Sequence, residues 1–165
     1  MKIHYGVAVI ASVLMLGAGC SNIPPTLEAD TVPRAVAPAP SSATRLDLSG
    51  SGLKSVPAYV FGRTDLSELD VSSNNLTGAL QAEIRHLKNL QVLDASGNEM
   101  TGVPAEIGQL SALRDLDLSE NKLTGLPLEL GNLQNLRRLD LRGNTISKQD
   151  LDAIRGKLKG TEILE

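Results

Sequence analysis

Aromatic residues and cysteine are nearly absent from this sequence. Its 165 residues include two Tyr, one Phe and no Trp, so any hydrophobic core must be aliphatic. The single cysteine, Cys20, excludes a disulfide framework within one chain. The net charge of −3 is mild and argues against a general nucleic-acid binder, which would be basic.

The common signatures of catalysis are also missing. The sequence has no cysteine pair, no HExxH, no Walker-type phosphate loop and no GxSxG elbow. His4 lies in an apolar N-terminal segment, and no catalytic motif surrounds His86. We therefore expect a protein that is not an enzyme, with no catalytic residue, no bound metal and no cofactor.

The N-terminal segment "MKIHYGVAVIASVLMLGAGC" has the layout of a secretory signal over residues 1–19. Lys2 precedes an apolar run, and small residues stand directly before Cys20. The run is too short to span a bilayer comfortably as a helix. The ending "LGAGC" resembles the lipobox of bacterial lipoproteins, and this resemblance implies cleavage before Cys20 and acylation of that residue. Ser21 resembles the outer-membrane sorting choice of that family, which implies a protein lipid-anchored in the bacterial cell envelope, at the outer membrane. The alternative is an ordinary signal peptide followed by a chance cysteine.

Proline and alanine dominate the segment that follows the cysteine. Five of the eight prolines lie in residues 21–42, which show no apolar periodicity. Such a segment cannot bury enough apolar surface to offset its ordering entropy. We interpret residues 20–42 as a lipidated cysteine and a tether.

A pattern of about 23 residues then repeats through residues 43–146. The units begin at Ala43, Leu66, Leu90, Leu113 and Leu136, with spacings of 23, 24, 23 and 23 residues. Four of them read "LSELDVSSNNL", "LQVLDASGNEM", "LRDLDLSENKL" and "LRRLDLRGNTI". This LxxLxLxxNxL pattern resembles the leucine-rich repeat family. The resemblance implies an α/β solenoid of about five repeats, a curved right-handed coil with parallel strands on the concave face and short helical or irregular returns on the convex face.

Elementary physics favours the same arrangement. In "LDLS" the alternation points Leu116 and Leu118 inward and Asp117 outward. One repeat buries about seven apolar side chains at roughly 2 kcal/mol each, yet orders 23 residues at roughly 1.5 kcal/mol each, so it is stable only when stacked. Buried amides need hydrogen-bond partners, so we expect a structural ladder of asparagines bonded to main-chain groups, formed by Asn74, Asn98, Asn121 and Asn144.

A solenoid needs covered ends. The stretch "SKQDLDAIRGKLKG" predicts a helix with Ser147 as its N-cap, and we assign residues 147–165 to a C-terminal capping helix and tail. No cap is recognisable at the N-terminal end of the array.

Charged residues flank the inward leucines in every unit. The candidate binding residues on the concave face are Arg45, Asp47, Glu68, Asp70, Asp94, Arg114, Asp115, Asp117, Glu120, Arg137, Arg138, Asp140 and Arg142. They predict a face that is acidic in the middle and basic at its C-terminal end. Five stacked aspartates should repel one another and raise their pKa values unless cations offset them, and this ladder is either a ligand site or a family pattern without a ligand.

The function that we expect is the binding of a protein or peptide partner, for example a cell-envelope component, with a membrane contact through the lipid anchor and no nucleic acid. The alternatives are a structural envelope protein without a dedicated ligand and, if the signal is misread, an intracellular or host-directed adaptor.

Overall fold

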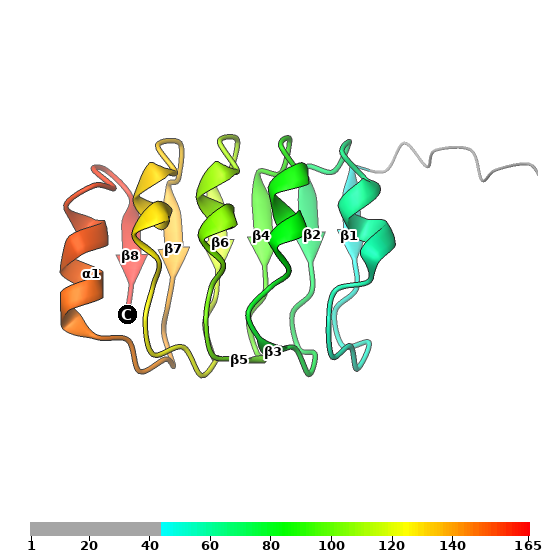
Figure 1. The fold of residues 1–165 in the computed structure, drawn as a ribbon, viewed down its shortest axis with the longest axis horizontal. Coiled ribbons are helices and arrows are strands. Elements are labelled where there is room, and N and C mark those ends of the chain that lie inside the picture. Colours follow the sequence, from blue (N-terminus) through cyan, green and yellow to red (C-terminus); the bar gives the residue numbers. More distant parts are fainter. Residues whose placement is uncertain (1–43) are drawn as a thin grey trace, which may run out of the picture. The chain divides into compact units, whose positions relative to one another are not determined.

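Parallel strands and narrow helical returns alternate along the chain. The computed structural model describes residues 44–165, and the predicted signal segment, Cys20 and the tether lie outside the described residues. Within 44–165, strands form one row and helices form a second row in front of it (Figure 1). None of the described helices is both long enough and apolar enough to cross a membrane.

Six short strands form one parallel sheet in the order β1-β2-β4-β6-β7-β8. Each spans three residues: β1 Arg45–Asp47, β2 Glu68–Asp70, β4 Val92–Asp94, β6 Asp115–Asp117, β7 Arg138–Asp140 and β8 Glu162–Leu164. The register of the first five strands follows the sequence repeat, with Leu46, Leu69, Leu93, Leu116 and Leu139 side by side. The predicted α/β leucine-rich repeat solenoid is confirmed.

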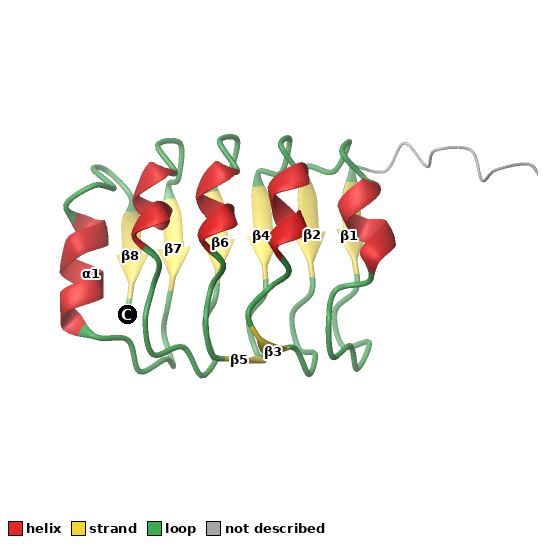
Figure 2. Cartoon of the chain, in the orientation of Figure 1, coloured by secondary structure: helices red, strands yellow, loops and turns green. Residues whose placement is uncertain are grey.

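The returns are 3-10 helices of five residues each (Figure 2). They are η1 Ala58–Gly62, η2 Ala82–His86, η3 Ala105–Gln109 and η4 Leu128–Asn132. Three of them start directly after a proline, whose fixed φ suits the residue before a first helical turn. In the second unit Gln81 replaces proline, and its side chain donates to the Val56 carbonyl at 2.7 Å. A minor two-stranded sheet joins β3 (Thr77–Gly78) to β5 (Glu99–Met100).

The core between strands and returns is almost wholly aliphatic. Each central repeat contributes one leucine from its strand and one branched residue from its helix, such as Leu116 of β6, Ile107 of η3 and Leu130 of η4, all at most 1% exposed. Phe61 is the one aromatic side chain among the buried residues of the described chain. Burial of this kind contributes about 1.5–3 kcal/mol for each large side chain, which explains how a chain without Trp forms a core.

Asparagine side chains connect successive turns inside the array. The Asn98 amide donates to the Val71 carbonyl at 3.0 Å in the preceding repeat, and its oxygen accepts from the Leu76 N–H at 3.1 Å. Asn74, Asn121 and Asn144 make the equivalent pairs of bonds. These side chains therefore satisfy main-chain groups that the tight turns leave without a ladder partner.

The C-terminal end is closed by a helix and by a strand that the sequence does not predict. Helix α1 spans Lys148–Arg155, and its N-cap Ser147 accepts from the Asp150 N–H at 3.2 Å. The helix ends earlier than the sequence suggests, so Lys157 lies beyond it. The tail then pairs as β8 with β7, parallel and in register with the repeats. The tail is thus a sixth strand of the sheet.

Two glycines permit close approach between the last returns. A methyl group at Gly108 in η3 would overlap the carbonyl group of Glu129 in η4. A methyl group at Gly131 would overlap the side chain of Lys157 in the same way. At this position η2 carries Arg85 and η1 carries Phe61, so the glycines are confined to the C-terminal half of the array.

Candidate functional site: the face of the strands

Two rows of side chains cross the open face of the sheet. Strand register aligns the first residue of each strand in a mixed row, which consists of Arg45, Glu68, Val92, Asp115 and Arg138. It aligns the third residue in an aspartate row, which consists of Asp47, Asp70, Asp94, Asp117 and Asp140. The face therefore joins side chains that lie 23 or 24 residues apart in sequence, as parallel pairing requires.

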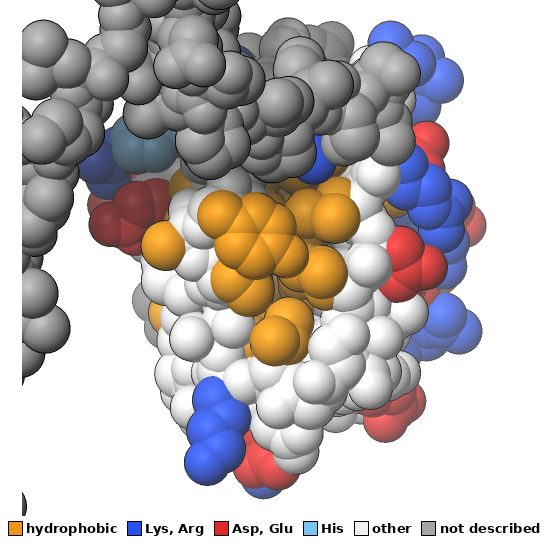
Figure 3. Space-filling model, turned by 90° about the vertical axis from the view of Figure 1, so that its right-hand side faces the viewer, with side chains coloured by type: hydrophobic (Ala, Val, Ile, Leu, Met, Phe, Trp, Pro, Cys, Tyr) orange, Lys and Arg blue, Asp and Glu red, His pale blue; other side chains and the backbone are white. Residues whose placement is uncertain are grey.

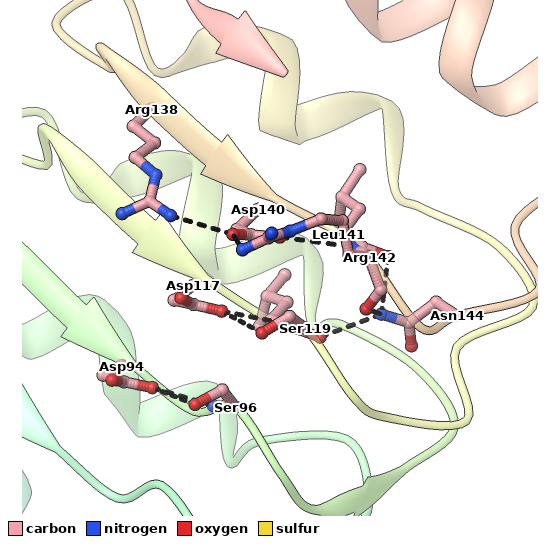
Figure 4. Close-up of polar contacts among 10 residues, drawn as sticks. Asp94, Ser96, Asp117, Ser119, Arg138, Asp140, Leu141, Arg142 and Asn144 are labelled. Atoms are coloured by element: carbon pink, nitrogen blue, oxygen red, sulfur yellow. Dashed lines mark hydrogen bonds and ion pairs between the residues drawn. The ribbon is translucent and has the colours of Figure 1, made fainter. Parts of the chain in front are cut away.

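Four residues of the aspartate row terminate their strands through the same turn. In each case one carboxylate oxygen accepts from the N–H and the hydroxyl of the serine two residues later. For Asp117 these distances are 2.9 and 2.6 Å to Ser119, and for Asp94 they are 3.0 and 2.6 Å to Ser96 (Figure 4). Asp47 and Asp70 repeat the arrangement with Ser49 and Ser72.

At the first aspartate of the row, this turn reverses an expectation about charge. The sequence predicts raised pKa values for the stacked aspartates, but the hydrogen bonds from Ser49 hold the pKa of Asp47 below its usual value. Hydrogen bonds to the ionised carboxylate favour that form, and here they outweigh the opposing effect of desolvation. The aspartate row thus contributes to the structure as well as to the charge of the face.

Asp140 differs from the other four. Arginine replaces serine two residues later, and the Arg142 guanidinium contacts the carboxylate at 2.6 and 2.9 Å, while Arg138 contacts it at 2.9 Å (Figure 4). The Asp140 side chain is 0% exposed, although both arginines remain about half exposed. The hydrogen bond from Arg142 is the main reason that the pKa of Asp140 is lowered. The signal in the sequence is "LDLR" in place of "LDLS".

The basic end of the face is therefore partly neutralised. Arg138 and Arg142 share one buried carboxylate, whereas Arg137 and Arg114 have no carboxylate within ion-pair distance among residues 44–165. These two arginines precede their strands and line a hollow of about 220 Å³ with Gln91. Both are exposed, and neither is compensated by a carboxylate in the described part of the chain.

At the acidic centre, Glu68 forms an exposed pair with Arg45 at 3.2 Å. Asp115 is the first residue of β6, between the acidic centre and the basic end of the face. Glu120 lies in the turn after β6 and has a left-handed φ of 52°. The predicted residues thus lie along one face, with Arg114, Glu120, Arg137 and Arg142 at its margins rather than within the strands.

The hollows on this face are shallow. Two of them, of about 100 and 120 Å³, lie over Asp70 and Asp94 and over Asp94 and Asp117. Sites for drug-sized ligands usually enclose about 300–1,000 Å³. A wider, open hollow of about 450 Å³ lies on the convex side between η1 and η2, with His86 on its rim. In the described part of the chain, no three acidic, histidine or cysteine side chains converge on a possible metal position.

Comparison with known proteins places this chain among repeat proteins. The leucine rich repeat family profile matches residues 41–100, and a two-copy leucine rich repeats profile matches 88–130 and 111–156. A curated relative is the CCR4-Not complex 3'-5'-exoribonuclease subunit Ccr4 of Schizosaccharomyces pombe, 51% identical over 53 residues. That match covers 32% of this chain and only 8% of the yeast protein.

Solved structures share the fold over a larger part of the chain. A leucine-rich repeat protein of Leptospira interrogans is 44% identical with a TM-score of 0.64, covering 67% of this chain and 28% of that protein. A chain of the BIR3–SERK2 complex of Arabidopsis thaliana is 38% identical with a TM-score of 0.52, covering 56% of this chain and 51% of that one. Together the two profiles extend over residues 41–156, and the strands, turns and asparagines of the structure follow the same period. The chain belongs to the leucine-rich repeat family.

Proposed function

We propose that the face of the strands binds a protein or an extended peptide and that the protein performs no catalysis. The observation that carries this proposal is the ordered charge of the face: it is acidic over its centre, and at one end Arg114 and Arg137 have no ion-pair partner within residues 44–165. The hollows there are too small to enclose a small molecule, whereas a polypeptide can contact several strands at once. The BIR3–SERK2 complex is an assembly of two proteins, which supports a similar use of the fold here.

Opposed charges orient a partner and speed its encounter more than they tighten the complex. We therefore expect a partner whose own charges run in the opposite sense, basic opposite Asp94 and Asp117 and acidic opposite Arg137. Binding should weaken as salt rises, because the Debye length falls from about 10 Å at 0.1 M to about 3 Å at 1 M.

The test compares charge reversals on the two sides of the solenoid. Arg114→Glu with Arg137→Glu changes the proposed face without touching the Arg138–Asp140–Arg142 cluster, so circular dichroism should stay unchanged. Capture of proteins from a bacterial envelope extract should fall, most clearly at low salt.

The matched control is Arg85→Glu with Lys88→Glu, which reverses two cations in and after η2 on the convex side. Capture that responds to this control and ignores the strand-face variant would show that the binding surface lies on the convex side. If neither variant changes capture, the alternative of a structural envelope protein without a dedicated ligand is favoured.

We further propose that the mature protein begins at Cys20 and is lipid-anchored in the bacterial envelope, at the outer membrane. The support is the order of charge, apolar run, small residues and cysteine in residues 1–20. Two or three acyl chains hold a protein to a membrane much more firmly than one. Radiolabelled palmitate should label the protein, and Cys20→Ala should release a folded, unlabelled product. An unlabelled wild-type protein in the soluble fraction would contradict the anchor and favour an intracellular or host-directed adaptor.

A further inference from the structure

The two ends of the solenoid are closed to different degrees. At the C-terminal end α1 covers the core, and Ile154 and Leu158 are buried against it. Within residues 44–165, β1 and β8 each have a neighbour on one side only and are the two edges of the sheet, but no described helix precedes β1 to cover the core at the N-terminal end. Figure 3, which looks at this end, shows a cluster of hydrophobic side chains in view.

The first repeat exposes positions that are buried elsewhere. Leu46, Leu48 and Leu53 are half-buried, whereas the residues at the same positions in the second, third and fourth repeats are all buried. Tyr59 in η1 of this repeat is 61% exposed. A solenoid end with a free strand edge and an exposed core needs a cover.

Only some of the main-chain groups of β1 and its flanking residues bond to the second repeat. The bonds to the second repeat use the Thr44 carbonyl, the Leu48 N–H and the Gly50 N–H, at 2.7, 2.8 and 3.0 Å. In a strand, the N–H and the carbonyl of one residue point to the same side, and those of the next residue point to the other side. The N–H and carbonyl groups of Arg45 and Asp47 therefore point to the free edge.

These two residues make the edge complementary to itself. In an antiparallel pair of β1 strands centred on Leu46, Arg45 of each copy lies opposite Asp47 of the other. Both pairs would exchange two main-chain hydrogen bonds and bring opposite charges together on the strand face. The two Leu46 side chains would meet on the core side, which would join the two cores.

We propose that the N-terminal edge strand is a self-association surface and that its partner is a second copy of this chain, paired through antiparallel β1 strands about a two-fold axis. The charge arrangement favours this occupant over a head-to-tail neighbour. If β8 of one copy bound β1 of the next in the repeat register, Arg45 would face Glu162 but Asp47 would face Leu164 without a partner, so one charge pair would form instead of two, and the contact would not close. The two-fold pairing leaves both strand faces open and on the same side.

The test is a charge exchange measured by sedimentation velocity on the full chain over a wide concentration range. Cys20→Ala is present in every arm, so that neither lipid nor a disulfide can hold copies together. The parent protein should form dimers. Arg45→Asp alone and Asp47→Arg alone should each weaken dimerisation about tenfold or more, because each places like charges opposite each other twice.

Mixing the two single variants should restore dimers. The Arg45→Asp strand carries two acidic side chains, the Asp47→Arg strand carries two basic ones, and antiparallel pairing sets each acid opposite a base. Loss of folding cannot produce this rescue. Asp94→Arg is the matched control: it breaks the same turn, to Ser96 instead of Ser49, but lies inside the sheet, so dimerisation should not change.

Three outcomes would overturn the proposal. The first is a parent protein that stays monomeric, including one whose edge is covered by its own N-terminal residues. The second is the formation of open polymers, which a closed two-fold contact forbids. The third is a dimer that dissociates with Asp94→Arg but not with the edge variants.

Discussion

Replacing Asn121 with alanine tests how the repeats are held together. The Asn121 side-chain oxygen accepts from the Met100 N–H at 3.0 Å, and its amide group donates to the carbonyls of Ala95, Leu118 and Ser119 at 3.0 to 3.1 Å. Asn121 is 7% exposed and Met100 is 1% exposed, so water cannot easily replace these contacts.

The four bonds do not carry equal weight. Each of the three carbonyls keeps another donor within the array, supplied by Asn98, Asn144 and Gly97 in turn. Only the Met100 N–H is left without an acceptor. An orphaned buried donor costs about 1–3 kcal/mol, and the small cavity adds to this, so Asn121→Ala should lower the free energy of unfolding by about 2–3 kcal/mol.

Urea unfolding followed by circular dichroism measures this difference. Asn121→Asp is a sharper variant, because it keeps an acceptor for Met100 but sets a carboxylate against three carbonyl oxygens, and it should be less stable than Asn121→Ala. The control is Lys122→Ala, the next residue along, whose exposed pair with Glu99 should contribute less than about 1 kcal/mol. If Asn121→Ala lay within about 0.5 kcal/mol of the wild type, the asparagines would not be the connection that we describe.

Three further outcomes are expected. Leu116→Asp should unfold the array, because it places a charge in an aliphatic core, whereas Asp117→Ala should cost about 1 kcal/mol for the lost turn to Ser119; equal melting temperatures would contradict the assigned strand phase. The folded pKa of Asp140 lies below its unfolded value, so its ionised form contributes stability at neutral pH that is lost as pH falls below the ordinary aspartate value of 3.8; stability curves against pH should be flatter on the acid side for Asp140→Asn, and an unchanged slope would argue against the ion cluster. Gly108→Ala should lower the melting temperature more than Gly62→Ala, which has open space around it, and thermal scans of the two variants would decide this.

The repeat period and the phase of the strands can be predicted from the sequence because each copy states the same pattern. A pattern such as LxxLxLxxN fixes which residues of the strand alternate between core and solvent and where the buried asparagine lies. A single three-residue strand could be assigned in either phase, but four copies in register leave one phase. The family profiles and the strand pairing agree with that interpretation.

The features that could not be predicted from the sequence depend on contacts that occur only once and not in every repeat. Strand β8 reads only "EIL", too short for alternation to be recognised, and it forms because β7 offers an open edge. The burial of Asp140 likewise needs two arginines to reach it from opposite sides, and this follows from neither repeat pattern nor net charge. The sequence predicts a free basic patch at this end, whereas Arg138 and Arg142 are also structural, so reversing them would destabilise the fold.

The glycines of the last returns bear on which shorter versions of this protein could exist. Removing residues 113–135 would delete one period and bring η3 against α1, where Gly108 would take the place of Gly131 beside Lys157. Removing residues 90–112 would instead bring η2 against η4, so that Arg85 would take the place of Gly108 beside the Glu129 carbonyl group. Of these two deletions, loss of residues 113–135 keeps a glycine at the close contact with the following return, whereas loss of residues 90–112 does not.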